Sequence, residues 1–254
     1  MNNTASILAL FFCSIAIPNI ALADVVLSDF ISLVQDVDPG ANTIQTGYTP
    51  TSGPNSVLFV TLSFDNVGDP ADSATFGGIA LTKVDTGANR IFYLTDPGTA
   101  PGDIVLNLGA ASDGGGNELV TVGTLLDVDF SSITALTGAT ASGSILSGST
   151  FTDLDAGSFV LSQLGANNHT GTFSPVAGNP ILASIDGGSG NYDGAVTGAV
   201  VSGGFTPSVD GFNNSNFLSG ISVAFGTSNV PEPGSLGVLG LLMSAAMVTR
   251  RRKR

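Results

Sequence analysis

The segment Val57-Leu-Phe-Val-Thr-Leu-Ser-Phe64 sets the fold class of this 254-residue chain. Large apolar residues recur at every second position, so that Leu58, Val60, Leu62 and Phe64 share one face. Side chains alternate between the two faces of a β-strand, and a period of two therefore predicts a strand with one buried face.

The same period recurs on both sides of this segment, and no stretch before the C-terminal region shows a long helical period. Turn sequences such as Asp96-Pro97-Gly98 and Asp186-Gly-Gly188 separate the expected strands. We therefore predict an all-β protein, a jelly-roll-like antiparallel sandwich of two sheets and roughly ten strands, rather than a seven-stranded immunoglobulin unit. The other clear strands are expected at residues 79–84, 90–95, 103–108, 118–128, 158–164, 181–185, 194–201 and 221–225.

The N-terminus has the pattern of a secretory signal peptide. An apolar run at residues 7–17 ends at Pro18, and Ala21-Leu-Ala23 matches the small-residue cleavage pattern. We predict that the Sec translocon exports the chain, that residues 1–23 are removed and that Asp24 begins the mature protein. Cys13, the single cysteine, is lost with this segment, so the mature protein contains no disulfide.

The body, residues 24–229, is strongly acidic. It contains 19 acidic residues and only two basic ones, Lys83 and Arg90, which leaves a net charge of −17. Phosphate binding needs clustered cations, so this composition argues against a nucleic-acid partner. The charge keeps an exported protein soluble and can attract divalent cations.

The last 25 residues have three parts in a fixed order. Pro231-Glu232-Pro233 comes first, and its prolines favour an extended backbone that cannot pair fully into a sheet. An uncharged apolar run at residues 236–248 follows, which we expect to form a short membrane helix. From Pro233 to Thr249 a helix would reach only ~25 Å, less than the ~30 Å hydrocarbon core, as suits a temporary anchor. The basic cluster at the end stays cytoplasmic by the positive-inside rule. This cluster consists of Arg250, Arg251, Arg252, Lys253 and Arg254.

This C-terminal segment resembles the PEP-CTERM sorting signal of Gram-negative bacteria in each of its three parts. The resemblance implies recognition and processing by exosortase, an integral-membrane enzyme. Together with the N-terminal pattern, this tail divides the chain into a signal peptide at residues 1–23, a β-sandwich domain at 24–229 and a sorting tail at 230–254. The precursor is then tethered in the inner membrane with a periplasmic body, and the processed protein reaches the cell surface or the extracellular space. A plain stop-transfer anchor after a proline-rich linker is the alternative.

Part of the body also resembles a module of secreted bacterial β-sandwich proteins. The similar segments are Phe76-Gly77-Gly78-Ile-Ala-Leu-Thr82, Arg90-Ile-Phe-Tyr-Leu-Thr-Asp-Pro-Gly98 and Gly102-Asp-Ile-Val-Leu106. The resemblance supports the fold and implies no activity.

Catalytic motifs are not apparent in the body, and we predict no catalytic residue. His169 is the only histidine, and no Gly-x-Ser-x-Gly elbow, Walker loop or dinucleotide fingerprint joins a strand to a helix. Without cysteine in the mature chain, a zinc site would depend almost entirely on carboxylates. Tyr48, Tyr93 and Tyr192 are the candidates for stacking on sugars, although packing in the core or at its rim is the ordinary role of each.

Three aspartate pairs have the spacing that places two carboxylates on one face of a strand. They are Asp36-Val-Asp38, Asp127-Val-Asp129 and Asp153-Leu-Asp155. Calcium prefers clusters of oxygen ligands, yet none of the pairs fits a calcium-loop pattern, and solvent-facing strand ends explain them equally well. We assign no cofactor and no metal residue, and leave structural calcium open.

The sequence therefore predicts a non-enzymatic protein of the cell surface or extracellular matrix. The resemblance of the tail implies a link to exopolysaccharide or biofilm, with polysaccharide as a candidate partner. A carbohydrate- or calcium-binding β-sandwich module is the alternative from another class. A hydrolase whose active site contains two carboxylates is a third hypothesis.

Overall fold

The computed structural model describes residues 23–35, 40–63, 72–85, 89–109, 118–167, 171–186, 192–213 and 217–228. These residues belong to one compact unit, Leu22–Val230. They form 18 strands and one short 3-10 helix, η1 (Phe130–Ser132), and every strand pairing is antiparallel. The all-β antiparallel prediction is confirmed. The predicted C-terminal membrane helix lies outside the described residues.

The first half of the body folds into two sheets, with strand orders β1-β9-β3-β7-β6 and β2-β8-β4-β5. We call them the first inner sheet and the first outer sheet. The strands of the first inner sheet are β1 (Val26–Gln35), β3 (Val57–Ser63), β6 (Thr82–Asp85), β7 (Asn89–Thr95) and β9 (Glu118–Leu126). Those of the first outer sheet are β2 (Gly40–Tyr48), β4 (Ser73–Phe76), β5 (Ile79–Ala80) and β8 (Gly102–Leu108).

The second half forms two further sheets, with orders β10-β18-β13-β16-β15 and β11-β12-β17-β14. We call them the second inner sheet and the second outer sheet. The second inner sheet contains β10 (Thr134–Thr137), β13 (Phe151–Asn167), β15 (Ile181–Ile185), β16 (Tyr192–Phe205) and β18 (Phe217–Phe225). The second outer sheet contains β11 (Ala139–Ser142), β12 (Ile145–Gly148), β14 (Ser174–Pro175) and β17 (Ser208–Asp210).

The two halves share one topology. In the first half the pairs β1–β9, β2–β8 and β3–β7 are nested around the hairpin β4–β5. In the second half β10–β18, β12–β17 and β13–β16 are nested in the same way around β14, which is followed by a turn closed by a bridge between Val176 and Asn179. Nested pairing of this kind is the rolled-up hairpin of a jelly roll. The body is therefore a tandem pair of jelly rolls, which we call the first and second sandwich.

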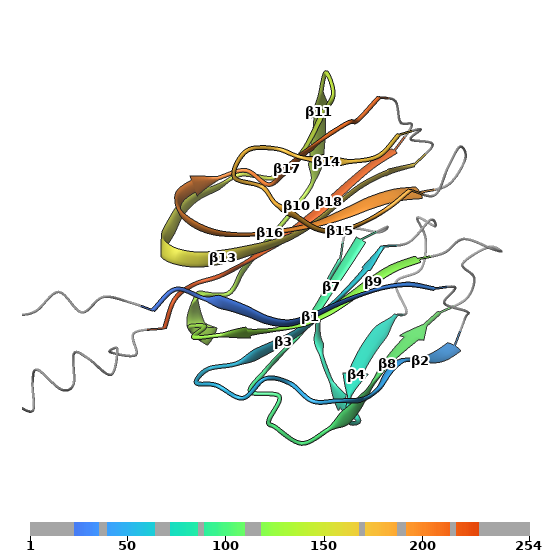
Figure 1. Cartoon of the computed structure of the whole chain (residues 1–254), viewed down its shortest axis with the longest axis vertical. Coiled ribbons are helices and arrows are strands. Elements are labelled where there is room, and N and C mark those ends of the chain that lie inside the picture. Colours follow the sequence, from blue (N-terminus) through green and yellow to red (C-terminus); the bar gives the residue numbers. More distant parts are fainter. Residues whose placement is uncertain are drawn as a thin grey trace, which may run out of the picture. The chain divides into compact units, whose positions relative to one another are not determined.

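Three hydrophobic clusters hold four stacked layers together (Figure 1). One lies between the sheets of the first sandwich and contains Leu58 and Phe92, and a second lies in the second sandwich around Leu164. The third joins the two inner sheets through residues such as Phe59 and Phe225. The jelly-roll-like prediction is right in topology, but the count of one sandwich with two sheets is wrong, since each inner sheet has an apolar layer on both faces.

Strand β3 is buried on both faces, whereas its sequence predicts that only one face is buried. All seven residues of β3 are buried. Leu58, Val60 and Leu62 pack within the first sandwich, whereas Val57 and Phe59 pack toward the second inner sheet. A strand buried on both faces is a continuous apolar run, which the Val-Leu-Phe-Val core of this segment already is.

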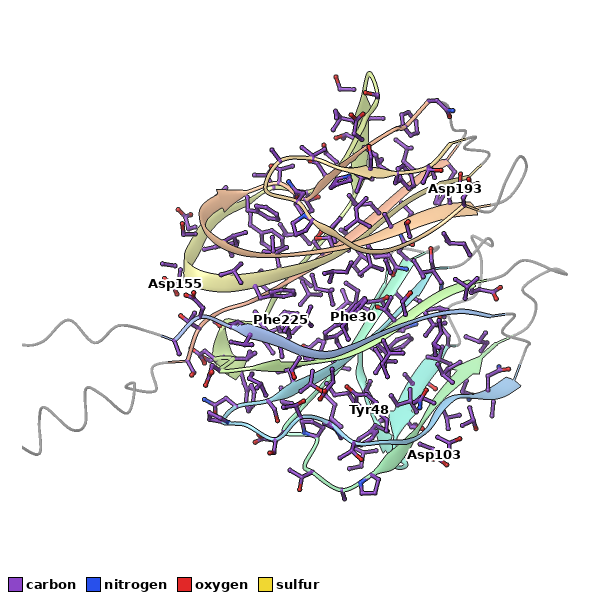
Figure 2. The ribbon with its side chains drawn as sticks, viewed as in Figure 1. Phe30, Tyr48, Asp103, Asp155, Asp193 and Phe225 are labelled. Carbon is purple, nitrogen blue, oxygen red and sulfur yellow. The ribbon has the colours of Figure 1, made fainter. Side chains whose placement is uncertain are left out.

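Aromatic rings fill the centre of the contact between the two sandwiches. Tyr93 of β7 meets Phe225 of β18 edge to face, with ring centroids 6.2 Å apart. Figure 2 shows Phe225 and Phe30 in this central layer of side chains. Gly123 makes room for the ring of Phe59, because a Cβ at this position would lie 2.6 Å from Cζ of that ring. The apolar half of the interface is thus closely packed.

The other half of this interface is polar and hydrogen-bonded. The Asn89 side chain is fully buried, and its Nδ2 donates to the backbone oxygens of Gln163, at 3.3 Å, and Ser219, at 3.1 Å. Ser63 Oγ donates to Asn89 Oδ1 over 3.3 Å. Buried polar groups of this kind need partners, and Asn89 is therefore a specific cross-link between the first inner sheet and the second.

Replacing Asn89 by alanine should destabilise the body by about 2–3 kcal/mol, because two buried carbonyl oxygens and one hydroxyl group each lose a hydrogen-bond partner. The matched control is Asn107→Ala on the exposed side of β8, which should stay within about 0.5 kcal/mol of the native protein. Urea unfolding of the three proteins measures the difference. Equal unfolding midpoints for Asn89→Ala and Asn107→Ala would show that the hydrogen bonds of Asn89 contribute nothing to the stability of the body.

Several strand boundaries differ from the prediction. The strand expected at residues 79–84 is divided at Leu81, where the chain passes from the first outer sheet to the first inner sheet as β5 and β6. The strands expected at 158–164 and 194–201 are the centres of the much longer β13 and β16. Strands β1, β2, β4, β10, β11, β12, β14 and β17 were not expected. Most of these are short or lie at sheet edges, where alternating burial is weak.

Candidate functional site

Both cations of the body belong to one buried ion cluster. Lys83 Nζ lies 2.8 Å from Asp72 Oδ1, and Arg90 Nε pairs with Asp72 Oδ2. Asp72 comes just before β4, while Lys83 and Arg90 are on β6 and β7, so the cluster ties the two sheets of the first sandwich together. The side chains of Asp72 and Arg90 are 2% and 3% exposed. Both cations are therefore paired with Asp72 within the first sandwich. The remaining charged side chains of the described residues are acidic.

The pair Asp127-Val-Asp129 forms the junction between the two sandwiches. Asp127 has a positive φ of 62°, which breaks the strand geometry that would place both carboxylates on one face. The Asp129 carboxylate caps η1, accepting from Ser131 N at 2.9 Å and Ser131 Oγ at 2.7 Å. Between them, Val128 is fully buried. The two aspartates therefore serve different local roles, and burial raises the pKa of Asp127.

Backbone hydrogen bonds hold this junction in place. Val128 N donates to Asn55 O over 3.1 Å, and Asp129 N donates to Gly226 O over 2.8 Å. Ser228 N donates to Asp127 O over 2.8 Å. The junction is thus bonded to the first sandwich on one side and to the end of β18 on the other.

The pair Asp153 and Asp155 is exposed on β13. Two register shifts interrupt the pairing of β13 with β16 here, and Leu154 packs against a small cluster around Phe151. Asp155 and the buried Asp193 lie at opposite ends of the second sandwich (Figure 2). The third pair, Asp36 and Asp38, lies outside the described residues, as does His169. Among the residues that the structure describes, no three His, Cys, Asp or Glu side chains come close enough to hold a metal ion.

The tyrosines that the sequence offered for sugar stacking are packing residues where they are described. Tyr48 is 5% exposed, and its hydroxyl bonds with Thr124 Oγ1 at 3.1 Å. Burial is the main cause that raises the pKa of Tyr48. Tyr93 packs on Phe225 between the sandwiches. The side chain of Tyr192 lies outside the described part of the structure.

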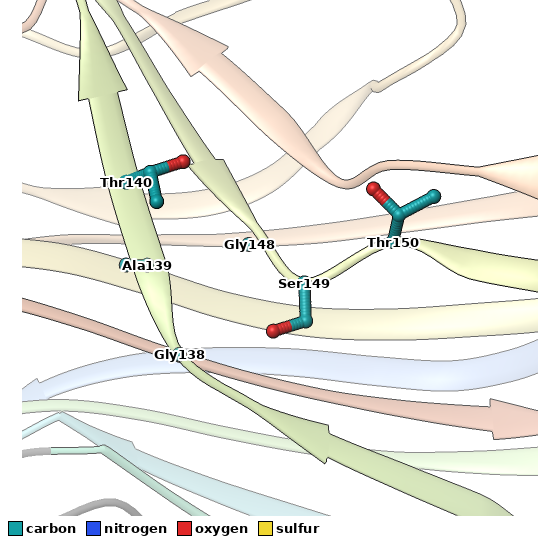
Figure 3. Close-up of a pocket in the computed structure, with 6 residues that line it drawn as sticks. All are labelled: Gly138, Ala139, Thr140, Gly148, Ser149 and Thr150. Atoms are coloured by element: carbon teal, nitrogen blue, oxygen red, sulfur yellow. The ribbon is translucent and has the colours of Figure 1, made fainter.

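A shallow groove of about 320 Å³ lies at the base of the hairpin β11–β12. Figure 3 shows its lining residues on β11 and on the segment that leaves β12. They are Gly138, Ala139, Thr140, Gly148, Ser149 and Thr150. The groove offers hydroxyl groups but no charged or aromatic side chain, so it lacks the stacking surface of a typical sugar site. Sequence reasoning missed it because it forms only where two neighbouring strand ends diverge.

The two ends of the body lie side by side. Val25 N donates to Gly157 O over 2.9 Å, and a Cβ at Gly157 would lie 3.1 Å from Asp24 Cα and 2.9 Å from Thr227 Cγ2. Val25, the second residue of the predicted mature protein, is fully buried. The body therefore has its predicted N-terminus, Asp24, and the last residues before the C-terminal tail at the same place.

No helix in the described ranges of the chain is long and apolar enough to cross a membrane. Ala21, the triplet Pro231-Glu232-Pro233 and the basic cluster from Arg250 to Arg254 lie outside those ranges. The tail is therefore identified by its sequence.

Comparison with known proteins identifies one segment. The family model of the PEP-CTERM protein-sorting motif matches residues 229–253. No curated protein and no solved structure matches the chain. The match covers all three parts of the C-terminal segment and does not extend into the strands of the body. The chain carries a PEP-CTERM sorting motif at its C-terminus, which implies an exported protein that exosortase sorts.

Proposed function

We propose that this chain is a non-enzymatic protein of the bacterial cell surface or extracellular matrix, associated with exopolysaccharide or biofilm. The observation that carries the proposal is the sorting motif at residues 229–253. The Sec translocon exports the chain, the tail holds the precursor in the inner membrane, and exosortase processes it.

Features of the body support a structural role. Its layers are tied by buried polar contacts, with Asp72 inside the first sandwich and Asn89 between the sandwiches. Asp24 and Thr227 both lie beside Gly157, so the chain enters and leaves the body at one place.

A fractionation experiment tests the matrix role. We expect the processed protein in the isolated extracellular matrix, and we expect a polysaccharide-degrading enzyme to release it. The matched treatment is 1 M sodium chloride, which should leave it in place if the protein is held by neutral contacts rather than by charge. Protein that is found only in the medium, or that remains with the cells after the polysaccharide is removed, would contradict the matrix role.

A further inference from the structure

Most sheet edges in the described body carry a feature that prevents pairing with another strand. In the first sandwich, β1 has a register shift near Asp29, β2 has two register shifts, β5 has two residues and β6 carries Lys83. In the second, β14 is two residues long and contains Pro175, and β15 follows Pro180 and has a register shift. Charges, prolines, bulges and short strands are the usual protection of an edge.

The chain from β10 through β11 lacks charge, proline and register shift, and its two four-residue strands are protected by their shortness alone. It forms the edge of both sheets of the second sandwich, first as β10 and then as β11. In β10 one carbonyl already has a partner, because Ser149 Oγ donates to Thr137 O over 2.8 Å. In β11 the residues Thr140, Ala141 and Ser142 are exposed, and the pairing with β12 is regular. Among the strands that the structure describes, β11 is therefore the edge with the least protection.

Charge is unevenly distributed, and it is low around β11. Residues 24–129 contain 14 acidic residues, whereas residues 130–228 contain five. No charged residue stands between Asp129 and Asp153, the segment that contains β10, β11 and β12. In the strands of the second outer sheet only Asp210 is charged, on β17, two strands in from the edge. Two copies of this acidic chain can approach at β11 without placing carboxylates opposite one another.

We propose that β11 pairs with β11 of a second copy of this chain, antiparallel, and so continues the second outer sheet from one body into the other. The unpaired backbone groups of an edge strand are the donors and acceptors for such an addition. The side chains of β11 are Ala, Thr, Ala and Ser, which are small enough for two backbones to reach pairing distance. Pairing of a strand with its own copy uses the same surface twice, as in a two-fold dimer.

The assembly ends at two copies. The far edge of the second outer sheet is β14, where Pro175 lacks the N–H that a further strand would need. Four residues provide few hydrogen bonds, so free copies associate weakly in dilute solution. Chains held by their tails on one surface have a much higher effective concentration, which favours the pairing there.

Cysteine cross-linking in the exporting cell tests the pairing on the full chain. Cys13 is the only native cysteine and is replaced by serine, and single cysteines are then placed in turn at Ala139, Thr140, Ala141 and Ser142. The matched control is Thr43→Cys, an exposed position on edge strand β2 of the first sandwich. After mild oxidation we expect at least one β11 position to give tenfold more cross-linked dimer than Thr43→Cys.

Sedimentation of the purified full chain in detergent is the second measurement. Added salt weakens repulsion between acidic bodies, so the native dimer fraction should rise with protein concentration and between 20 and 500 mM salt. Thr140→Asp places like charges near each other across the pair and should reduce the dimer fraction at least tenfold, whereas Thr43→Asp should behave as the native protein. No cross-link at any β11 position, equal cross-linking at Thr43→Cys, equal dimer fractions for the two aspartate variants, or a ladder of larger assemblies would each overturn the proposal.

Discussion

Chains in which Pro231, Glu232 and Pro233 are all replaced by alanine are expected to remain full-length in the inner membrane. Alanine restores two backbone donors and is favoured over proline in a helix by about 3 kcal/mol per residue. A helix over the apolar run can then extend toward the body and cover the segment that exosortase must reach. The substitution also removes the one charge of the triplet. Mass spectrometry of the membrane and surface fractions measures the outcome.

The control for this variant leaves the triplet intact. Replacing the five terminal cations, Arg250 to Arg254, by neutral residues should weaken orientation and retention in the membrane, because the positive charges favour the cytoplasmic side. The two variants should therefore fail differently, one as a retained full-length chain and the other as a chain with mixed orientation. Normal trimming of the alanine variant would show that the triplet is not the recognised element.

Replacing Asp72 by asparagine should destabilise the body more than any surface substitution. The change removes the Asp72 carboxylate from a buried ion cluster in which the side chain of Arg90 is only 3% exposed. Removing one partner of a buried ion pair typically costs about 3–5 kcal/mol. For a domain of this size that lowers the melting temperature by roughly 6–20 °C. Urea and thermal unfolding measure the effect.

Two further variants separate the loss of this ion pair from other causes of lost stability. Combining Asp72→Asn with Arg90→Met removes both charges of the Asp72–Arg90 pair, and most of the lost stability should return, since buried ion pairs are often replaced by apolar residues at little cost. Asp155→Asn, on an exposed part of β13, removes the same acidic charge and should leave stability within about 0.5 kcal/mol. A double variant less stable than Asp72→Asn alone would contradict this account of the cluster.

The strand content could be predicted from the sequence wherever large apolar residues alternate or run together. Segments around Val57, Ile104 and Ile221 are strands in the structure. The turn glycines also behave as their sequence suggests, since Gly77 and Gly78 both have positive φ in the hairpin between β4 and β5. Strands β10, β11 and β12 consist mainly of Thr, Ala, Ser and Gly, whose weak alternation gives no comparable signal.

The duplication could not be read from the residues because the two jelly rolls share pairing order rather than sequence. The Val57–Ser63 strand has seven residues, whereas its equivalent β13 has 17. Asp72 and Arg90 meet because the topology brings the start of β4 next to β7. The separation of Asp72 and Arg90 along the sequence does not predict that contact. The composition of the body, 19 acidic residues and two cations, could have suggested that both cations are paired. The sorting tail, by contrast, is a linear motif and was recognisable in full.

The most direct test of the central claim is the mass of the native protein in matched cells with and without exosortase. With exosortase, we predict a surface form that begins at Asp24 and is shortened by the mass of the tail at residues 230–254. Without it, the protein should stay in the inner membrane with the tail intact. Identical, untrimmed protein in both hosts would contradict exosortase sorting and leave the C-terminus as a plain membrane anchor.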